Sequence, residues 1–114
     1  SFPPRRSSDL LAEQYASQEL RLQAGLSTAY WSNGNSRAEV DFLVQDDHGV
    51  YPLEIKAAEN LQAKSLRSFY EKFRPPRSFR ASLSPYRQES WLTNIPLYAL
   101  SRLGEELRKQ SGSQ

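Results

Sequence analysis

Two short acidic strings in the first half of the chain contain residue types that bind divalent metals. Glu39 and Asp41 belong to the first string, Glu54 and Lys56 belong to the second, and each string lies in a stretch with the composition of a strand. Because alternate residues of a strand project from one face, each pair shares a face. Three carboxylates and a lysine would then be available for metal-assisted chemistry on a phosphodiester.

A hairpin would align the two strings. Turn-forming residues occupy positions 46–49, and alternating apolar and polar residues flank them. A hairpin centred there pairs Asp41 with Glu54 and Glu39 with Lys56. The same register places apolar residues opposite one another on the other face, namely Val40, Phe42 and Val44 opposite Ile55, Leu53 and Tyr51. Two carboxylates directly opposite each other repel, and a hard divalent cation between them would relieve the repulsion.

An ordinary solvent-facing hairpin would account for the same residues. Charged side chains commonly cover the wet face of a half-buried hairpin. Glu39 opposite Lys56 would then be a cross-strand ion pair worth less than about 1 kcal/mol. Spacing alone leaves both interpretations open, because short motifs often match by chance.

Charge is distributed unevenly along the chain. Residues 1–63 carry five basic and nine acidic side chains, whereas residues 64–87 carry seven basic side chains against Glu71 alone. A basic segment beside an acidic metal site would attract a phosphate backbone. We expect nucleic-acid contacts from five of these basic residues, Lys64, Arg67, Lys72, Arg77 and Arg80. In the alternative interpretation, the basic residues near 64–72 form the solvent-exposed face of a helix.

Length and composition exclude several classes of protein. A chain of 114 residues forms one domain with a single core. The absence of cysteine excludes thiolate metal sites, and the one histidine, His48, lies in the expected turn, so zinc is disfavoured. No apolar run reaches the length of about 18 residues that crosses a bilayer, and no signal-peptide pattern is present. We therefore expect a cytoplasmic protein without a membrane partner.

Periodicity and turn residues predict the elements in the order helix, three strands, helix, strand, short strand, helix. They cover residues 8–22, 28–33, the hairpin 37–57, 60–73, 78–84, 90–93 and the segment after 96. Residues 1–110 would form one domain, and 111–114 a disordered tail. The last helix carries a stripe of leucines, which either caps the core or supports a homodimer.

This order of elements resembles the common core of the PD-(D/E)XK nuclease superfamily, which has a restriction-endonuclease-like α/β (α+β) fold. In that family an aspartate in one strand and a Glu-x-Lys element in the next bind magnesium, and a glutamate on the first helix often assists. The matching residues here are Asp41, Glu54, Lys56 and Glu13. Val40 stands where the family name has proline.

The resemblance implies a magnesium- or manganese-dependent site with defined roles. The metal ligands would be Asp41, Glu54, the backbone carbonyl of Ile55, and Glu13 for a second ion or a bridging water. Lys56 would orient or deprotonate the attacking water, and Glu39 would tune Lys56 across the hairpin. The metal would lower the pKa of a bound water and stabilise charge on the phosphate.

Several strings also resemble an uncharacterised domain at the carboxyl end of prokaryotic AAA-type ATPases. They are 12–14, 18–20, 39–43, 52–56, 64–66 and 94–98. The chain begins Ser1-Phe2-Pro3-Pro4 and contains no methionine, as expected of a piece of such a protein, whose ATPase module would be a partner. The chain contains no phosphate-binding Gly-x-x-x-x-Gly-Lys-Ser/Thr loop, so we expect no ATP site in it.

The sequence therefore predicts a metal-dependent nuclease-like domain that hydrolyses or binds nucleic acid, with DNA the expected form, as an accessory to an AAA-type ATPase. The alternative is a catalytically silent nuclease-fold module. It would bind DNA or a protein and regulate the ATPase without cleaving anything.

Overall fold

The computed structural model describes residues 7–23, 25–30, 42–57 and 64–112 of the chain. In chain order the elements are α1 Ser7–Arg21, β1 Ser27–Tyr30, β2 Phe42–Gln45, β3 Val50–Lys56, α2 Lys64–Phe73, β4 Phe79–Ser82, β5 Arg87–Gln88, β6 Thr93–Pro96, the 3-10 helix η1 Leu97–Arg102 and α3 Leu103–Gly112. The fold is a mixed α+β fold, as the sequence predicts.

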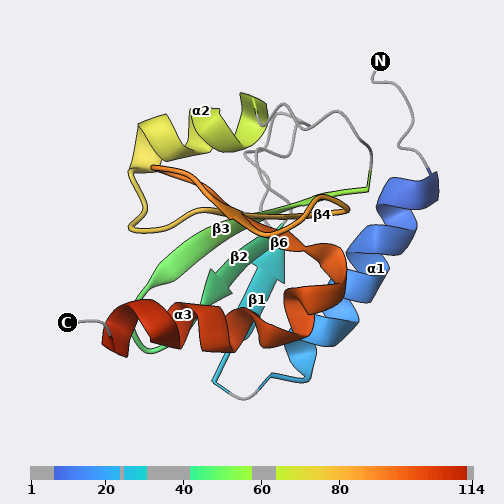
Figure 1. Cartoon of the computed structure of the whole chain (residues 1–114), viewed down its shortest axis with the longest axis horizontal. Helices are drawn as coiled ribbons and strands as arrows, with labels where there is room; N and C mark the ends of the chain where they lie inside the picture. Colours follow the sequence, from blue (N-terminus) through green and yellow to red (C-terminus); the bar gives the residue numbers. More distant parts are fainter. Residues whose placement is uncertain (1–6, 24, 31–41, 58–63, 113–114) are drawn as a thin grey trace.

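The strands form one six-stranded sheet in the order β1-β2-β3-β4-β6-β5. β1, β2 and β3 are an antiparallel meander, β3, β4 and β6 are parallel, and β5 returns antiparallel along β6. Figure 1 shows α2 on one side of this sheet and η1 with α3 on the other. The arrangement is therefore helices on both faces of a mixed sheet.

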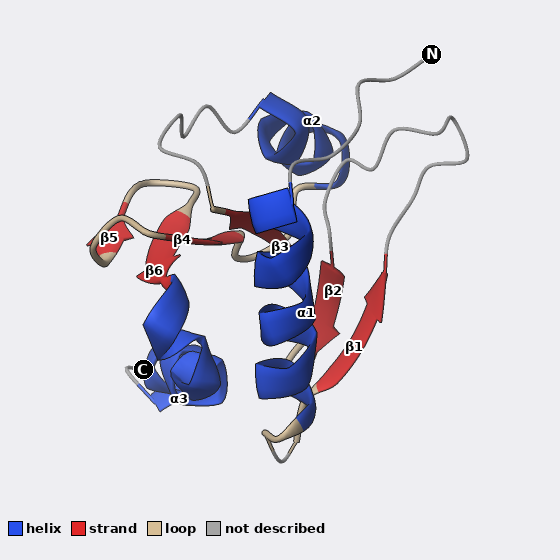
Figure 2. Cartoon of the chain, turned by 90° about the vertical axis from the view of Figure 1, so that its right-hand side faces the viewer, coloured by secondary structure: helices blue, strands red, loops and turns tan. Residues whose placement is uncertain are grey.

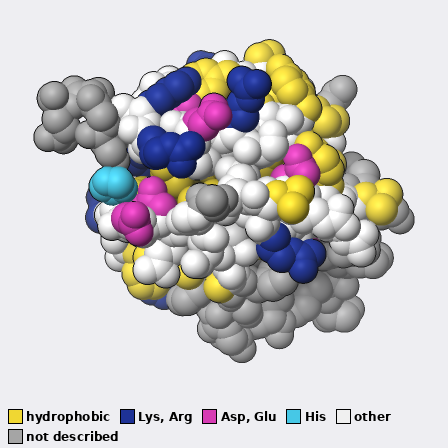
Figure 3. Space-filling view, turned by 90° about the horizontal axis from the view of Figure 1, so that it is seen from below, with side chains coloured by type: hydrophobic (Ala, Val, Ile, Leu, Met, Phe, Trp, Pro, Cys, Tyr) yellow, Lys and Arg dark blue, Asp and Glu magenta, His cyan; other side chains and the backbone are white. Residues whose placement is uncertain are grey.

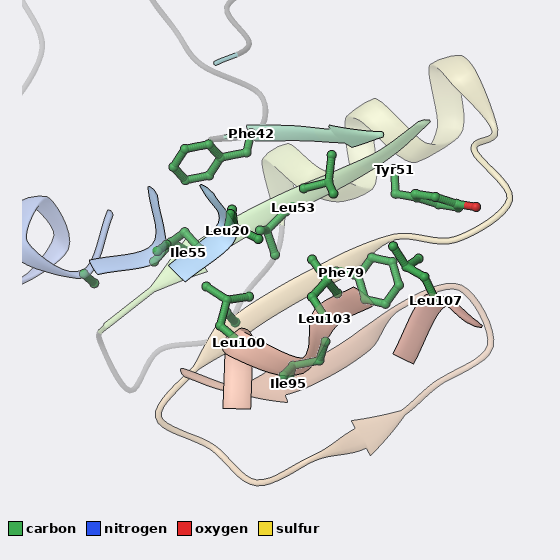
Figure 4. Packing of buried hydrophobic residues seen from close by; sticks show 14 residues of the cluster. Leu20, Phe42, Tyr51, Leu53, Ile55, Phe79, Ile95, Leu100, Leu103 and Leu107 are labelled. Atoms are coloured by element: carbon green, nitrogen blue, oxygen red, sulfur yellow. The ribbon is translucent and has the colours of Figure 1, made fainter. Parts of the chain in front are cut away.

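The main core lies between the sheet and the helices α1, η1 and α3. Alternate residues of β3 point into this core, and Tyr51, Leu53 and Ile55 are all buried there (Figure 4). Phe79 and Ile95 extend this core into the next two strands. α1 packs against β1, β3 and η1 on the same side (Figure 2).

The hairpin register predicted from the sequence is confirmed where the structure describes it. Phe42 pairs with Leu53, and Val44 pairs with Tyr51. The turn is held by Asp46, whose Oδ1 accepts the backbone N–H of His48 at 2.8 Å and that of Gly49 at 3.1 Å. A side chain that closes its own turn fixes the hairpin length and with it the register.

Tyr51 makes the hairpin sensitive to alkaline pH. Burial and then the charge of Asp46 raise the pKa of the Tyr51 phenol above its ordinary value near 10. Since the folded pKa is the higher one, this stabilisation is complete below about pH 10 and is lost as pH rises through the raised pKa. We expect the urea midpoint to fall as pH rises above about 10.

The replacement Tyr51→Phe should remove part of that alkaline loss, because phenylalanine does not ionise. Tyr98→Phe is the matched control, since Tyr98 is 81% exposed. An identical alkaline fall in the Tyr51→Phe and wild-type chains would show that the phenol does not titrate with unfolding.

A smaller core lies on the other face, under α2. It consists of Leu66, Phe69 and Leu92, with Leu43 and Trp91 packed against it. Here the sequence prediction needs correction. Residues 90–93 were expected to form a strand, but Trp91 and Leu92 lie in the loop between β5 and β6, and Thr93–Pro96 is the strand.

The carboxyl-terminal segment also differs in detail from expectation. It begins as the 3-10 helix η1 directly after Pro96, and only then becomes α3, which continues to Gly112. Leu100, Leu103 and Leu107 are buried in the main core, so these leucines close the core. Among the described helices, none combines the length and apolar composition that crossing a membrane requires.

Candidate functional site

The face of β3 that does not enter the main core carries the second acidic string. Glu54 is only 8% exposed, and Lys56 follows it two positions later at intermediate burial. Alternation along the strand puts both on the face that α2 covers, opposite to Leu53 and Ile55. The predicted shared face of Glu54 and Lys56 thus agrees with the observed strand.

A row of buried polar residues continues from Glu54 across the sheet. Glu54 is in register with Arg80 of β4, and Arg80 is in register with Asn94 of β6. All three are buried, with exposures of 8%, 8% and 3%. Neighbouring strands lie about 4.8 Å apart, so these side chains are lateral neighbours on one face. A buried row of this kind is uncommon unless its members compensate one another or bind something.

Asn94 is the centre of the hydrogen bonds in this row. Its Oδ1 accepts from Nε of Arg80 at 3.0 Å and from Oγ of Ser82 at 2.8 Å. Its Nδ2 donates to the backbone carbonyls of Ser84 at 3.2 Å and Pro85 at 3.0 Å. Asn94 therefore uses its acceptor and its amino group at once, and it fixes both the Arg80 guanidinium and the loop after β4. Sequence reasoning did not single out Asn94 or Ser82.

Of the other residues predicted for the metal site, the structure describes Glu13 and Ile55 but not Asp41 and Glu39. Glu13 is 8% exposed on α1, the helix that packs against β3 from the main-core side. Asp41 and Glu39 lie outside the described residues, so their pairing with Glu54 and Lys56 stays a prediction. Ile55, whose carbonyl is the predicted ligand, buries its side chain in the main core. Within the described ranges, no three acidic or histidine side chains form a metal-binding group.

Two of the predicted nucleic-acid contacts come together around one pocket. Arg67 from α2 and Arg80 from β4 border a pocket of about 470 Å³, together with Arg87, which was not among the predicted contacts. Lys72 lies elsewhere on α2, with its ammonium 5.3 Å from the Phe73 ring. Lys64 begins α2, and its side chain lies outside the described part of the chain.

Arg77 has a different environment from the other arginines. Its Nη1 donates to the backbone carbonyl of Glu106 at 3.1 Å, and its Nη2 lies 3.0 Å from Oε2 of the same residue. Both side chains are largely buried, at 9% and 13% exposure. The guanidinium also lies 4.7 Å from the Phe79 ring centre. This geometry favours a role in attaching α3 to the sheet.

The face that carries α3 has mixed charge. Seen from below in Figure 3, basic side chains lie beside acidic ones. Lys109, for example, lies 3.9 Å from Glu106, the partner of Arg77. Intermixed charges of opposite sign largely cancel at a distance, so this face attracts a polyanion only weakly.

Comparison with known proteins identifies a family. No curated protein and no solved structure matches this chain. One family description, "Domain of unknown function (DUF4143)", matches residues 9–100, which include α1 except its first two residues, every element from β1 to β6, and most of η1. Because this match covers most of the sequence, the chain belongs to the DUF4143 family.

Proposed function

We propose that this chain is a metal-dependent nuclease-like domain with a restriction-endonuclease-like core, which binds or hydrolyses nucleic-acid phosphodiesters as an accessory to an AAA-type ATPase. The observation that carries the proposal is the buried Glu54, with Lys56 on the same strand face and Arg80 in register beside it. A carboxylate, an ammonium and a guanidinium on one face are the groups that such chemistry needs.

The topology supports the proposed fold. β1, β2 and β3 form a meander, and α2 then crosses to β4, which is parallel to β3. That order of helix, three strands, helix and strand is the one expected of the nuclease core. The link to an ATPase rests on the sequence strings alone and is part of the proposal.

The donor set fits a hard divalent cation. Magnesium binds one or two protein carboxylates and takes its remaining ligands from water and substrate phosphate. Glu54 supplies one carboxylate, and the predicted hairpin register supplies Asp41 as the second. When bound, the metal would polarise the phosphate and lower the pKa of a coordinated water.

Lys56 and Arg80 would bind the attacking water and the phosphate groups. Lys56 would hold the attacking water or the phosphate through its ammonium, two positions from Glu54. Arg80 would donate charge-assisted hydrogen bonds to a phosphate of the bound nucleic acid, and its bond to Asn94 keeps its orientation fixed before substrate arrives.

One observation favours the catalytically silent alternative. Because Arg80 is the lateral neighbour of Glu54, its guanidinium can compensate the buried carboxylate without any metal. A domain that relied on that compensation would keep the fold and bind nucleic acid through its arginines, but it would not hydrolyse the strand.

Metal binding is the first test. We expect manganese to raise the melting temperature of the chain, because a ligand at 100 times its Kd stabilises the folded state by about 2.7 kcal/mol. The replacement Glu54→Gln should abolish that rise, whereas Glu105→Gln, at an exposed position of α3, should leave it unchanged. The absence of a metal response in the wild-type chain would refute the proposed metal site.

Cleavage of DNA and RNA with manganese separates the two alternatives. Lys56→Ala should keep the metal response and lose cleavage if Lys56 is catalytic. Equal cleavage by the wild-type and Lys56→Ala chains would indicate a contaminating nuclease. Salt-sensitive DNA binding without cleavage by the wild-type chain would select the silent module.

A further inference from the structure

Three arginines from three different elements border one pocket. Arg67 comes from α2, Arg80 from β4 and Arg87 from β5, and the β5–β6 loop, residues 89–92, completes the wall. Its volume of about 470 Å³ lies in the range of pockets that hold small ligands. A second hollow of about 330 Å³ adjoins it and shares Arg80, Arg87 and Glu89.

The pocket has a fixed base and an adjustable rim. Arg80 is 8% exposed, and its Nε is held by Asn94 at 3.0 Å. Arg67 and Arg87 are 65% and 77% exposed, so both can reorient toward a ligand. The Arg67 guanidinium lies 5.9 Å from the centre of the Trp91 ring. The fluorescence of Trp91 can therefore report binding in the pocket.

The charge of the lining suits a dianion. The lining has three arginines and one glutamate, Glu89, which lies 3.6 Å from Arg87, while Glu54 lies in register beside Arg80 and outside the lining. Glu71 lies 3.6 Å from Arg67 but is 59% exposed and outside the lining, and such an exposed pair exchanges easily for a stronger partner. A phosphate monoester carries a charge of about −1.5 to −2 at neutral pH, against −1 for an internal phosphodiester.

We propose that this arginine pocket binds the terminal phosphate of a single nucleic-acid strand. This proposal rests on the proposed function, because Arg80 of β4 lies beside Glu54 of β3. A nucleic-acid end bound at Arg80 is therefore one β-strand away from Glu54. The sheet spacing of about 4.8 Å then brings the first internucleotide linkage toward Glu54 and Lys56. The pocket thereby positions a strand by its end, and its contacts are independent of base sequence.

Fluorescence of Trp91 tests the proposal without metal. Trp31→Phe leaves Trp91 as the only tryptophan of the full chain. In EDTA, this protein is titrated with short single-stranded oligonucleotides that carry a 5′-phosphate, a 3′-phosphate or no terminal phosphate. We expect one phosphorylated form to bind about tenfold more tightly than the unphosphorylated one, and inorganic phosphate to compete with it.

Variants at the rim identify the pocket. Arg67→Gln and Arg87→Gln keep the fold because both side chains are exposed, and each should weaken binding of the phosphorylated strand about tenfold. Arg21→Gln removes an exposed arginine at the end of α1 and should leave affinity unchanged. An equal loss in Arg21→Gln would reduce the effect to general charge and overturn the proposal.

Two further outcomes would also overturn it. One is equal affinity for phosphorylated and unphosphorylated strands, and the other is a mononucleotide that binds as tightly as the phosphorylated strand, which would assign the pocket to free nucleotide. The two proposals can fail separately, because the phosphate titration is carried out in EDTA without metal. If only the nuclease proposal failed, the wild-type chain would show no manganese response but would still prefer the phosphorylated strand.

Discussion

Replacing Arg77 with methionine is expected to lower the free energy of unfolding by about 3 kcal/mol, because it leaves the largely buried carboxylate of Glu106 with only the exposed Lys109, at 3.9 Å, as a cationic neighbour. The change also removes the hydrogen bond from Nη1 to the Glu106 carbonyl and the stacking of the guanidinium near Phe79. Domains of this size are stable by about 5–15 kcal/mol, so the loss would be a large part of the total.

Urea denaturation monitored by circular dichroism measures this loss. Arg77→Lys keeps the charge but loses the fork of donors that reaches the backbone carbonyl and Oε2 of Glu106, so it should recover only part of the stability. Tyr86→Phe is a matched control at the same carboxylate, since the Tyr86 hydroxyl donates to Oε2 of Glu106 at 2.9 Å from an exposed position. We expect it to cost less than about 1 kcal/mol.

The same variants decide what Arg77 does. The sequence predicts Arg77 as a nucleic-acid contact, as a member of a basic segment. A variant that kept its full stability but lost affinity for DNA would support that role. A variant that lost stability, with unchanged affinity in its folded fraction, would assign Arg77 to the attachment of α3.

The hairpin was predictable because two independent local signals agree there. Alternation fixes which residues face the core, and the Asp46 turn fixes the length of the connection, so Phe42 opposite Leu53 followed from the sequence. A slip by one residue would have buried charged side chains, at a cost that no local interaction offsets. Register information of this kind is local, and sequence reasoning can use it.

The parallel part of the sheet was harder to predict. β6 is buried at every position, so Thr93–Pro96 shows no alternation, and it contains a proline and an asparagine. Trp91 is apolar but belongs to a loop, where its ring packs 5.2 Å from that of Tyr70. The apolar residues at 91–92 therefore predicted a strand where the structure has a loop. Trp91 is partly buried because of its tertiary contacts with α2, and not because it belongs to a strand.

The polar site shows the same limit. Glu54 and Lys56 were recognisable by their spacing within one strand, but Asn94 and Arg87 join the site only through β6 and β5, far along the chain. Basic residues also could not be sorted by sequence alone. Arg80 borders the pocket, whereas Arg77, only three positions earlier, binds Glu106. Which side of the sheet each side chain reaches depends on where β4 begins, and the sequence alone does not show that position.

Asn94→Leu is the second replacement with a large expected effect, about 3–4 kcal/mol of lost stability. It removes the acceptor for the buried Arg80 guanidinium and for the Ser82 hydroxyl. Hydrogen bonds to charged groups contribute about 1.5–3 kcal/mol, and a buried donor left without its acceptor costs its desolvation as well. The carbonyls of Ser84 and Pro85 also lose their donor.

Asn94→Asp and Ser82→Ala make the prediction specific. The aspartate keeps an acceptor for Arg80 and adds an opposite charge, so it should cost about 1–2 kcal/mol, mainly through the lost amide donors. Ser82→Ala removes a neutral donor to Asn94 and the acceptor for the backbone N–H of Ser84, and it should cost about 1 kcal/mol. Urea denaturation of the three variants should therefore rank leucine as most harmful, then aspartate, then the serine change. If Asn94→Leu cost no more than Ser82→Ala, Asn94 would not anchor Arg80, and the arginine pocket would have no fixed base.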